Sequence, residues 1–226
     1  MLLLGRFGLA VGVDLVALAP ASQRLLAYVA LAGRPVRRDL AAGVLWPTVV
    51  EDHAHGSLRA ALARLAARAP GVLHGDGPEV SLVAGVGVDL FEARASARRL
   101  LADAGAVGPD RAAAAIAGLS VELLPGWYED WAMLEAENWR QLRLHALEAA
   151  TGVLAGAGRF GEAVGAAQAA VDADPLRESP HAALIGVHLR EGNQSEALRE
   201  FERYRLRLGA VLGLEPTRRL RALLPG

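Results

Sequence analysis

Residues Leu123–Glu135 read LLPGWYEDWAMLE, and this stretch holds two of the four tryptophans of the chain. Trp127 and Trp131 flank the adjacent acids Glu129 and Asp130. Aromatic rings beside paired carboxylates can form a sugar-cleaving site, and they can also form a packed corner where a helix begins. Because the two acids are adjacent in sequence, they cannot both face one substrate, and the helix dipole stabilises acids in a first turn. The stretch therefore favours the start of a helix.

Composition limits the classes of protein that this chain can belong to. It has 226 residues, 53% of them hydrophobic, which is enough for one large domain or two modest ones with separate cores. It contains no cysteine, so neither a disulfide framework nor thiol chemistry is expected. The net charge of −1 excludes binding to a polyanion through bulk charge, so any nucleic-acid contact must be local.

The first residues, MLLLGRFGLAVGVDLVALA, are apolar but do not resemble a targeting segment. Leucines follow Met1 directly, whereas a signal peptide has a charged region before its apolar core. Arg6 and Asp14 interrupt the run, which falls short of the ~20 uncharged residues that span a bilayer. These features predict a cytoplasmic protein with no membrane partner.

The pattern of residues 1–88 predicts strands, three helices and a hairpin. The expected elements are short strands within 1–19, a helix from Pro20 with Ser22 as a candidate N-cap, helices at 37–45 and 51–68, and a hairpin at 72–82 that turns around GDGP. This order describes a winged helix-turn-helix in which the second and third helices form the DNA-binding pair. Another small α+β domain is the open alternative.

The remainder of the chain looks helical after a glycine-rich linker at 84–91. The expected helices are 91–104, 109–119, about 131–155, 159–173, 179–190 and 195–212, with a last turn from Pro216. GRFGEAV begins at Gly158 and GNQSEAL begins at Gly192, a spacing of 34 residues that is typical of tetratricopeptide-type helical hairpins. The chain is therefore predicted to be mainly α, with an α+β domain over residues 1–88 and an all-helical domain over residues 89–226.

Two motifs that suggest other functions fail on their context. GAGRFG at Gly156–Gly161 matches a dinucleotide fingerprint, but the preceding residues look helical and that fingerprint needs a preceding strand. His53 and His55 are two residues apart, which places them on different sides of a helix instead of at a chelating spacing. No catalytic arrangement, metal site or cofactor is expected, so an enzyme is the weakest interpretation.

Several longer segments carry a resemblance to a known family. LLPGWYEDWAMLEAENWRQLRLHALEA from Leu123 and DPLRESPHAALIGVHLREGNQSEALREFERYRLRLGAVLGLEP from Asp174 resemble the bacterial transcriptional activator domain. SQRLLAYVALAGRPVRRDLAAGVLWP from Ser22 and SLRAALARL from Ser57 resemble the DNA-binding domain that precedes it. Together they resemble the short form of the SARP family, the antibiotic regulatory proteins of actinobacteria, over nearly the whole chain. The motifs LLPGWYEDW and LRES.H are the specific ones.

This resemblance implies an OmpR-type winged helix followed by a tetratricopeptide-like activation domain. Family members bind direct repeats in promoters and recruit RNA polymerase, so promoter DNA, the polymerase and a second copy on DNA are the expected partners. The expected function is activation of a secondary-metabolite gene cluster. The resemblance also implies that the tryptophans fill the corner where the long helix joins the repeats, with Trp131 and Leu134 on one buried face. An exposed partner surface formed by Trp127 and Tyr128 is the alternative.

The third helix departs from the family pattern. Family members often carry Arg, Thr or Ser at the positions of His53, His55, Ala60, Ala63, Ala66 and Ala67. Here the outward stripe of Gly56, Ala60, Ala63 and Ala67 offers no group that could read base edges. Residues 1–88 hold eight arginines and six acids, a modest net charge of +2. A protein-interaction module with the same fold and a degenerate recognition helix is therefore the alternative function.

The remaining basic and hydroxyl groups supply the candidate DNA contacts. Arg59 and Arg64 are the longest donors on the third helix, and Ser57 lies nearer its N-terminal end, the end with which such helices read DNA. Three further arginines lie before and at the start of the second helix, where phosphate contacts are natural. The full predicted DNA-binding set is Arg34, Arg37, Arg38, Ser57, Arg59 and Arg64.

Overall fold

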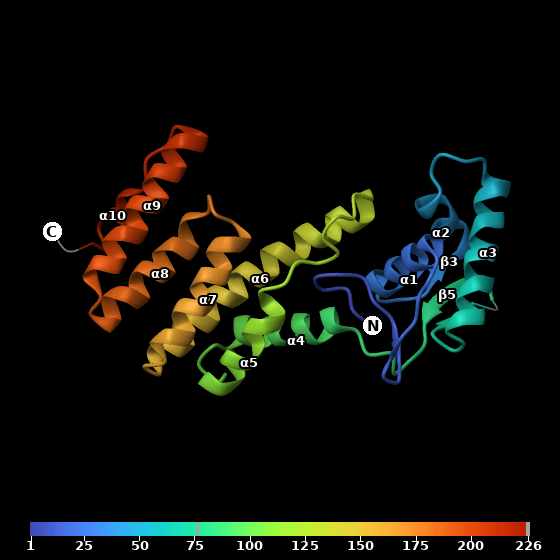
Figure 1. The fold of residues 1–226 in the computed structure, drawn as a ribbon, viewed down its shortest axis with the longest axis horizontal. Coiled ribbons are helices and arrows are strands. Elements are labelled where there is room, and N and C mark those ends of the chain that lie inside the picture. The colour runs from blue at the N-terminus through green and yellow to red at the C-terminus, as the bar shows by residue number, and fades with distance from the viewer. Residues whose placement is uncertain (76, 225–226) are drawn as a thin grey trace. The chain divides into compact units, whose positions relative to one another are not determined.

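The computed structural model describes residues 1–75 and 77–224, which form two compact units (Figure 1). The first unit consists of residues 1–91 together with 122–137. The second consists of residues 92–121 and the described chain from 138 onward. The chain therefore leaves the first unit and returns to it before the second unit is completed. The predicted domain boundary near Val88 remains a prediction.

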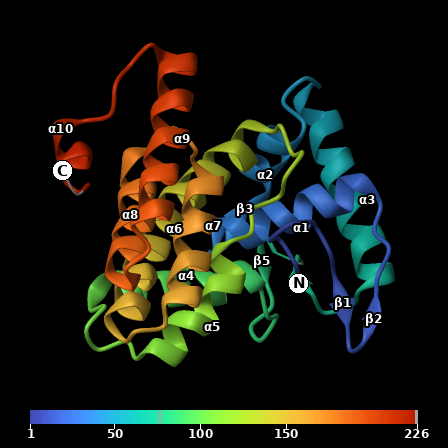
Figure 2. The same ribbon diagram turned by 60° about the vertical axis from the view of Figure 1, so that its left-hand side comes forward.

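Short strands and three helices make up the first unit (Figure 2). Its elements are β1 (Ala10–Val11), β2 (Asp14–Leu15), α1 (Pro20–Ala32), β3 (Val36–Arg37), α2 (Arg38–Leu45), α3 (Glu51–Arg68), β4 (Leu73–His74) and β5 (Glu79–Leu82). β1 and β2 form an antiparallel pair, and a separate antiparallel sheet has the order β3-β5-β4. The turn predicted at GDGP includes Asp76, which lies outside the described residues.

The core of the first unit lies where α1, α2 and α3 meet the sheet. Leu25 and Val29 of α1 pack with Leu45 of α2, Leu58 of α3 and Val80 of β5, and all five side chains are buried. Leu58 and Leu65 belong to the buried stripe of α3, and Leu62 beside them is only partly buried. Because the apolar residues of α3 recur every three or four positions, they lie on one face of the helix, and the opposite face lies in solvent.

Ser22 does not cap α1 as predicted. The helix begins at Pro20, whose fixed φ suits the first helical position, and no side chain caps it. The Ser22 hydroxyl instead donates to the carbonyl oxygen of Ala61 on α3 at 3.1 Å, in the buried core. A hydroxyl buried among apolar groups must find a partner, and the nearest one lies on the neighbouring helix.

The Leu123–Glu135 stretch packs in the first unit, so the predicted corner with the helical repeats is wrong. The ring of Trp131 lies 5.4 Å from that of Tyr28 on α1 and 6.0 Å from that of Trp127. Arg24 of α1 holds the same segment, because its Nε lies 2.8 Å from Glu129 Oε1.

The exposure of these side chains corrects a second prediction. Trp131 packs against the core but is only partly buried, and Leu134 is 63% exposed, so they do not share a buried face. Trp127 is partly buried against Phe7, with ring centroids 5.9 Å apart, whereas Tyr128 is 82% exposed. Of the two residues in the alternative partner surface, only Tyr128 is exposed, and a contact with a partner stays a prediction.

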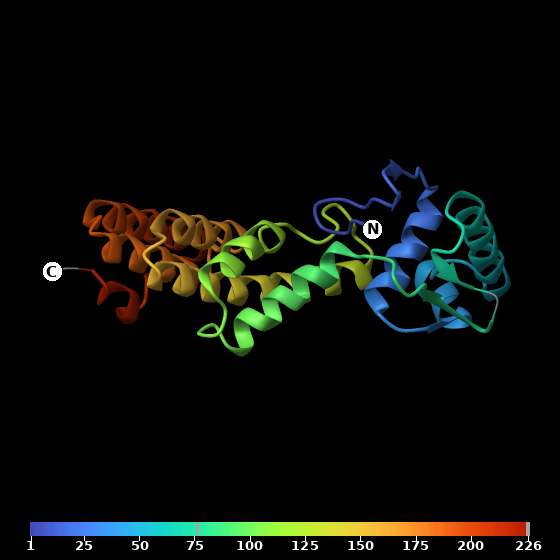
Figure 3. The same cartoon turned by 90° about the horizontal axis from the view of Figure 1, so that it is seen from below.

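The second unit is made of helices, and of α6 it contains only the part from residue 138 onward. The bounds are α4 (Asp89–Ala102), α5 (Pro109–Leu119), α6 (Asp130–Gly156), α7 (Phe160–Ala173), α8 (Glu178–Glu191), α9 (Gln194–Leu212) and α10 (Arg218–Arg221). α8 packs between α7 and α9 (Figure 3). The repeat places Ala163 in α7 and Ala197 in α9, and both are fully buried. Ala197 packs in one cluster with Ile185 of α8.

The GAGRFG motif is the turn between α6 and α7, with a helix and not a strand before it. Gly158 has a φ of +74°, a conformation that glycine adopts without strain, and it lies in the turn two residues after the end of α6. Arg159 then connects two helices, because its Nη1 donates to Asp110 of α5 at 2.6 Å and its guanidinium also pairs with Glu162. The hydrogen bond from Arg159 to Glu162 holds the pKa of Glu162 below its usual range. The motif serves helix packing.

The LRES.H motif connects α8 to three neighbouring helices. Arg177 donates to Gln141 Oε1 of α6 at 3.1 Å, and the Ser179 hydroxyl donates to Glu148 Oε1 of the same helix at 2.6 Å. Glu178 accepts a hydrogen bond from the backbone of Thr217, immediately before α10, at 2.9 Å. The last residue of the motif, His181, lies against α9. These residues therefore hold the helical stack together.

Limited proteolysis is expected to cut within residues 84–87 first. This turn is mostly exposed, whereas Val88 and Leu90 are buried and Asp89 accepts hydrogen bonds from the backbone of Leu3 and Leu4 at 2.8 and 3.1 Å. Residues 122–137 pack in the first unit, so the two fragments should co-elute in native buffer and separate in denaturant. Early cuts inside α3, or fragments that separate without denaturant, would contradict this arrangement.

Candidate nucleic-acid interface

The outward face of α3 is narrow and almost without functional groups. Gly56, Ala60, Ala63 and Ala67 fall along its centre, opposite the buried residues Leu58 and Leu65. Arg59 and Arg64 are five residues apart, or about 140° around the helix, so they flank this centre on opposite sides. The face that α3 turns to solvent thus has a smooth middle and a cation on each edge.

The two flanks of α3 differ in what accompanies the arginine. Ser57 and Arg64 are seven residues apart, so they share one stripe, which also includes the exposed His53. On the other flank, a Cβ added at Gly56 would lie 3.9 Å from an Arg59 Nη atom. The Arg59 guanidinium therefore folds back toward the N-terminal part of the helix, the end with which such helices read DNA.

The arginines around α2 are used unequally. Arg34 is exposed in the turn after α1, and Arg37 is exposed at the end of β3. Arg37 Nε donates to Asp39 Oδ1 at 3.1 Å, and this bond holds the pKa of Asp39 below its usual range. Arg38 is partly buried, and one of its terminal nitrogens donates to the carbonyl oxygen of Gly75. Arg38 thus attaches the start of α2 to the hairpin.

Carboxylates lie close to several of these cations. Glu51 and Asp52 occupy the first turn of α3, where the helix dipole stabilises them, and Glu79 pairs with Arg37 across the β3–β5 ladder. Glu51 Oε1 also lies 3.7 Å from His55 Nε2. Because carboxylates repel phosphate, the surface around the N-terminal end of α3 has mixed charge and is not a uniform basic patch.

The predicted set therefore divides into three places on one unit. Ser57, Arg59 and Arg64 lie on α3, Arg34 and Arg37 lie on the exposed side of the α1–α2 connection, and Arg38 lies between α2 and the hairpin. Whether any of them contacts DNA stays a prediction. His53 is not part of this set, although its seven-residue spacing from Ala60 places it on the outward face of α3.

A comparison with family models decides the class of the helical part. Residues 86–224 match the model described as the bacterial transcriptional activator domain. The chain belongs to this family. The match begins in the turn before α4 and includes every helix from there to α10. The resemblance of the LLPGWYEDW and LRES.H motifs to this family is thereby confirmed.

A solved structure shares the fold of this activator-domain protein. It is that of Mycobacterium tuberculosis EmbR in complex with a low affinity phosphopeptide, with a TM-score of 0.72 and 23% sequence identity. The similarity covers 98% of this chain but 62% of the EmbR chain, so this chain spans less than two thirds of that protein. No curated protein matches the sequence. The mostly helical fold predicted from sequence is confirmed by this likeness.

Two searches of the described residues bear on other functions of the activator-domain protein. Within residues 1–75 and 77–224, no helix is long and apolar enough to cross a lipid bilayer. In the same part of the chain, no three or more His, Asp or Glu side chains are grouped so that they could hold a metal ion.

Proposed function

We propose that this chain is a DNA-binding transcriptional regulator of the SARP type in its short form. The match of residues 86–224 to the activator-domain family is the single observation that carries the proposal. The order α1, α2, α3 and the β4–β5 hairpin in the first unit supports it, because this order is that of a winged helix-turn-helix. The protein acts in the cytoplasm and catalyses no reaction.

In this proposal α3 enters the major groove of promoter DNA. Arg59 and Ser57 reach base edges near the N-terminal end of the helix, and Arg64 lies toward a phosphate strand. Arg34, Arg37 and Arg38 contact the phosphate backbone of the DNA beside α3. Arg38 also attaches the start of α2 to the hairpin. Two copies bind direct repeats, and the helical unit recruits RNA polymerase to a secondary-metabolite gene cluster, as the family resemblance implies.

A protein-interaction module without DNA binding is the second candidate. The smooth outward face of α3 favours it, because Gly56, Ala60, Ala63 and Ala67 supply no donor or acceptor for base edges. The acids Glu51 and Asp52 at the reading end favour it too, since they repel phosphates. In that case the helical unit would work alone as a binding surface.

Two variants test the proposed division between phosphate and base contacts. Arg37→Ala is expected to weaken binding to all duplexes alike and to reduce the salt slope by about one unit, because a phosphate contact carries no sequence information. Arg59→Ala should cost ~1–3 kcal/mol on the promoter of its own gene neighbourhood and narrow the gap to a scrambled duplex. Both are measured by electrophoretic mobility shift with titrated protein.

Arg207→Ala is the matched control, because it removes an exposed arginine from α9, which has no proposed DNA contact. It should leave promoter binding within about twofold of the parent. If Arg59→Ala and Arg207→Ala behave alike, α3 does not read bases. If Arg37→Ala instead loses selectivity for the promoter, then Arg37 of β3 reads bases, and the proposed division of roles is wrong.

A further inference from the structure

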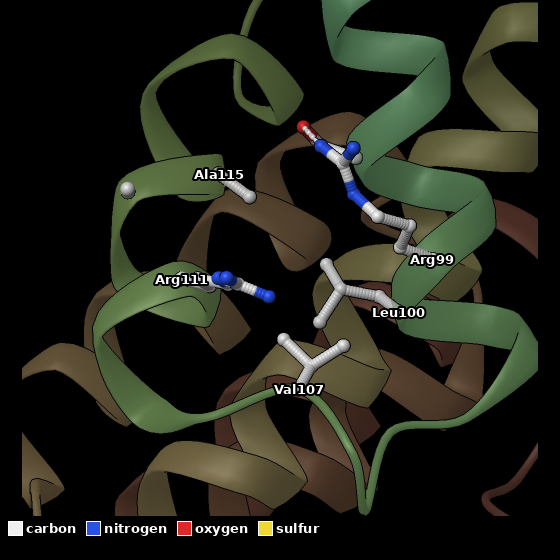
Figure 4. A pocket seen from close by; sticks show the side chains of 7 residues that line it. Arg99, Leu100, Val107, Arg111 and Ala115 are labelled. Atoms are coloured by element: carbon white, nitrogen blue, oxygen red, sulfur yellow. Dashed lines mark hydrogen bonds between the residues drawn. The ribbon is translucent and has the colours of Figure 1, made fainter.

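A cavity between α4 and α5 in the second unit is lined by two arginines (Figure 4). Its volume is about 460 Å³, within the range of small-molecule sites. Arg99 comes from α4 and Arg111 from α5, so the two guanidinium groups approach from opposite helices (Figure 4). The cavity is separate from α3 and from every residue of the proposed DNA interface.

Neither arginine is neutralised by a carboxylate in the described part of the chain. Arg99 Nη2 donates to the Ser96 hydroxyl at 3.1 Å, which orients the guanidinium without removing its charge. No ion pair or hydrogen bond of the Arg111 side chain is present among the described residues. Its neighbour Asp110 is engaged elsewhere, because Asp110 Oδ1 lies 2.6 Å from Arg159 Nη1.

Asp103, directly after α4, also has a partner of its own. Asp103 Oδ1 accepts a hydrogen bond from the backbone nitrogen of Ala106 at 3.1 Å, within the connection between α4 and α5. The local carboxylates thus stabilise the surrounding backbone and the packing of α7. They leave two cations facing one cavity, an arrangement that favours an anionic ligand because guanidinium groups bind carboxylates and phosphates with several donors.

The floor of the cavity is apolar. Leu100 is 2% exposed, and Val107 and Ala115 complete the wall between the two arginines (Figure 4). An inorganic anion would leave this apolar floor in water, whereas a ring attached to the anionic group would cover the floor and remove it from water. The charge and the floor together select an anion with an apolar body.

We propose that the α4–α5 cavity binds a small organic anion, with a phosphate or carboxylate group between Arg99 and Arg111 and an apolar body on Leu100 and Val107. The site belongs to the helical unit and does not depend on DNA binding by the first unit. It therefore gives the protein a ligand in addition to its proposed promoter and polymerase partners.

Isothermal titration calorimetry of the full chain without DNA, at low salt, tests this site. Phenyl phosphate is the probe, inorganic phosphate and phenol report the charged and apolar halves separately, and benzoate tests a carboxylate in place of the phosphate. Phenyl phosphate should bind with a Kd on the order of 1 mM, as expected for a ligand of this size in an open site. Inorganic phosphate should bind about tenfold more weakly, and phenol should show no saturable binding, because each lacks one of the two interactions.

Substitutions identify the residues involved. Arg99→Gln and Arg111→Gln should each weaken phenyl phosphate binding about tenfold or more, because each removes a charge-assisted hydrogen bond. Arg98→Gln is the matched control, since Arg98 is an exposed arginine of α4 that does not line the cavity. Circular dichroism should show unchanged thermal unfolding in all three variants, because these side chains are exposed.

Three results would overturn the proposal. One is an absence of saturable binding of phenyl phosphate and benzoate up to about 10 mM. Another is an equal loss of affinity in Arg98→Gln and Arg111→Gln, which would show attraction to overall charge instead of a site. The third is equal affinity for inorganic phosphate and phenyl phosphate, which would show that the apolar floor does not contribute to binding. None of these results depends on whether the protein binds promoter DNA.

Discussion

Replacing Trp139 with alanine is expected to lower the free energy of unfolding of the second unit by about 3–5 kcal/mol. Trp139 is the largest fully buried side chain, with 1% of its surface exposed. Its Nε1 donates to the carbonyl oxygen of Val121 at 2.9 Å, which joins α6 to the segment after α5. The variant would leave a large cavity and an unsatisfied carbonyl, a loss comparable to the whole stability of a marginal domain.

The other aromatic residues provide graded controls for urea denaturation followed by circular dichroism. Tyr128→Ala should change the unfolding free energy by about 0.5 kcal/mol or less, because its ring is 82% exposed. Trp131→Ala should fall between the two, since Trp131 is only partly buried. If Trp139→Ala proves as stable as Tyr128→Ala, the packing described for α6 is wrong.

Glu200→Ala is expected to destabilise the second unit by a similar amount, about 3–5 kcal/mol, because it breaks a buried pair and leaves its partner uncompensated. Glu200 Oε1 lies 2.6 Å from His181 Nδ1, and the two side chains are 2% and 1% exposed. His181 Nε2 lies 3.1 Å from the carbonyl oxygen of Pro175. The imidazole therefore connects α8, α9 and the turn before α8.

The geometry of this pair fixes where its hydrogens lie. A carbonyl oxygen only accepts, so His181 Nε2 must carry a hydrogen. A second hydrogen must lie between Nδ1 and Glu200, because two lone pairs would repel at 2.6 Å. The other carboxylate oxygen also has a partner, because Glu200 Oε2 lies 3.2 Å from Arg203 Nη1. Removing Glu200 would leave the buried His181 Nδ1 without its hydrogen-bond partner, beside the ring of Tyr204, whose centroid lies 4.2 Å from that of His181.

Two variants separate the buried pair from general effects on α9. Glu200→Gln keeps a hydrogen-bonding group of the same size beside His181 and should lower the free energy of unfolding clearly less than Glu200→Ala. Glu202→Ala breaks an exposed ion pair with Arg205 on the same helix and should change stability by less than about 1 kcal/mol. Equal losses in Glu200→Ala and Glu202→Ala by chemical denaturation would show that the pair contributes nothing beyond helix propensity.

Local sequence signals located several helices to the residue. The predicted bounds of 51–68 and 109–119 are those of α3 and α5, because acids or proline mark each first turn and breakers follow each end. Such signals did not reveal long-range contacts. Ser22 had the chemistry of an N-cap, but its hydroxyl bonds to Ala61, 39 residues away, a partner that only the packed core supplies.

The same limit applies to the candidate interface and to the cavity. The sequence placed Arg38 beside Arg37 as an equivalent phosphate contact, yet its guanidinium bonds to Gly75, 37 residues away, on the hairpin. No sequence motif links Arg99 and Arg111, and only the packing of α4 on α5 brings them to one cavity. Periodicity predicts which face of a helix is buried, whereas the partner of an individual polar side chain depends on the tertiary fold.

Sequence-directed binding of DNA by the first unit is measured most directly by fluorescence anisotropy of the full chain. The two labelled duplexes are the promoter beside its own gene and a scrambled version, titrated between about 50 and 200 mM salt. We expect the promoter to bind at least about tenfold more tightly, with a log–log salt slope of about −3 to −4 for each bound copy if Arg34, Arg37, Arg38 and Arg64 contact phosphates. Equal, salt-independent or undetectable binding of both duplexes would contradict the regulator proposal and favour the protein-interaction module.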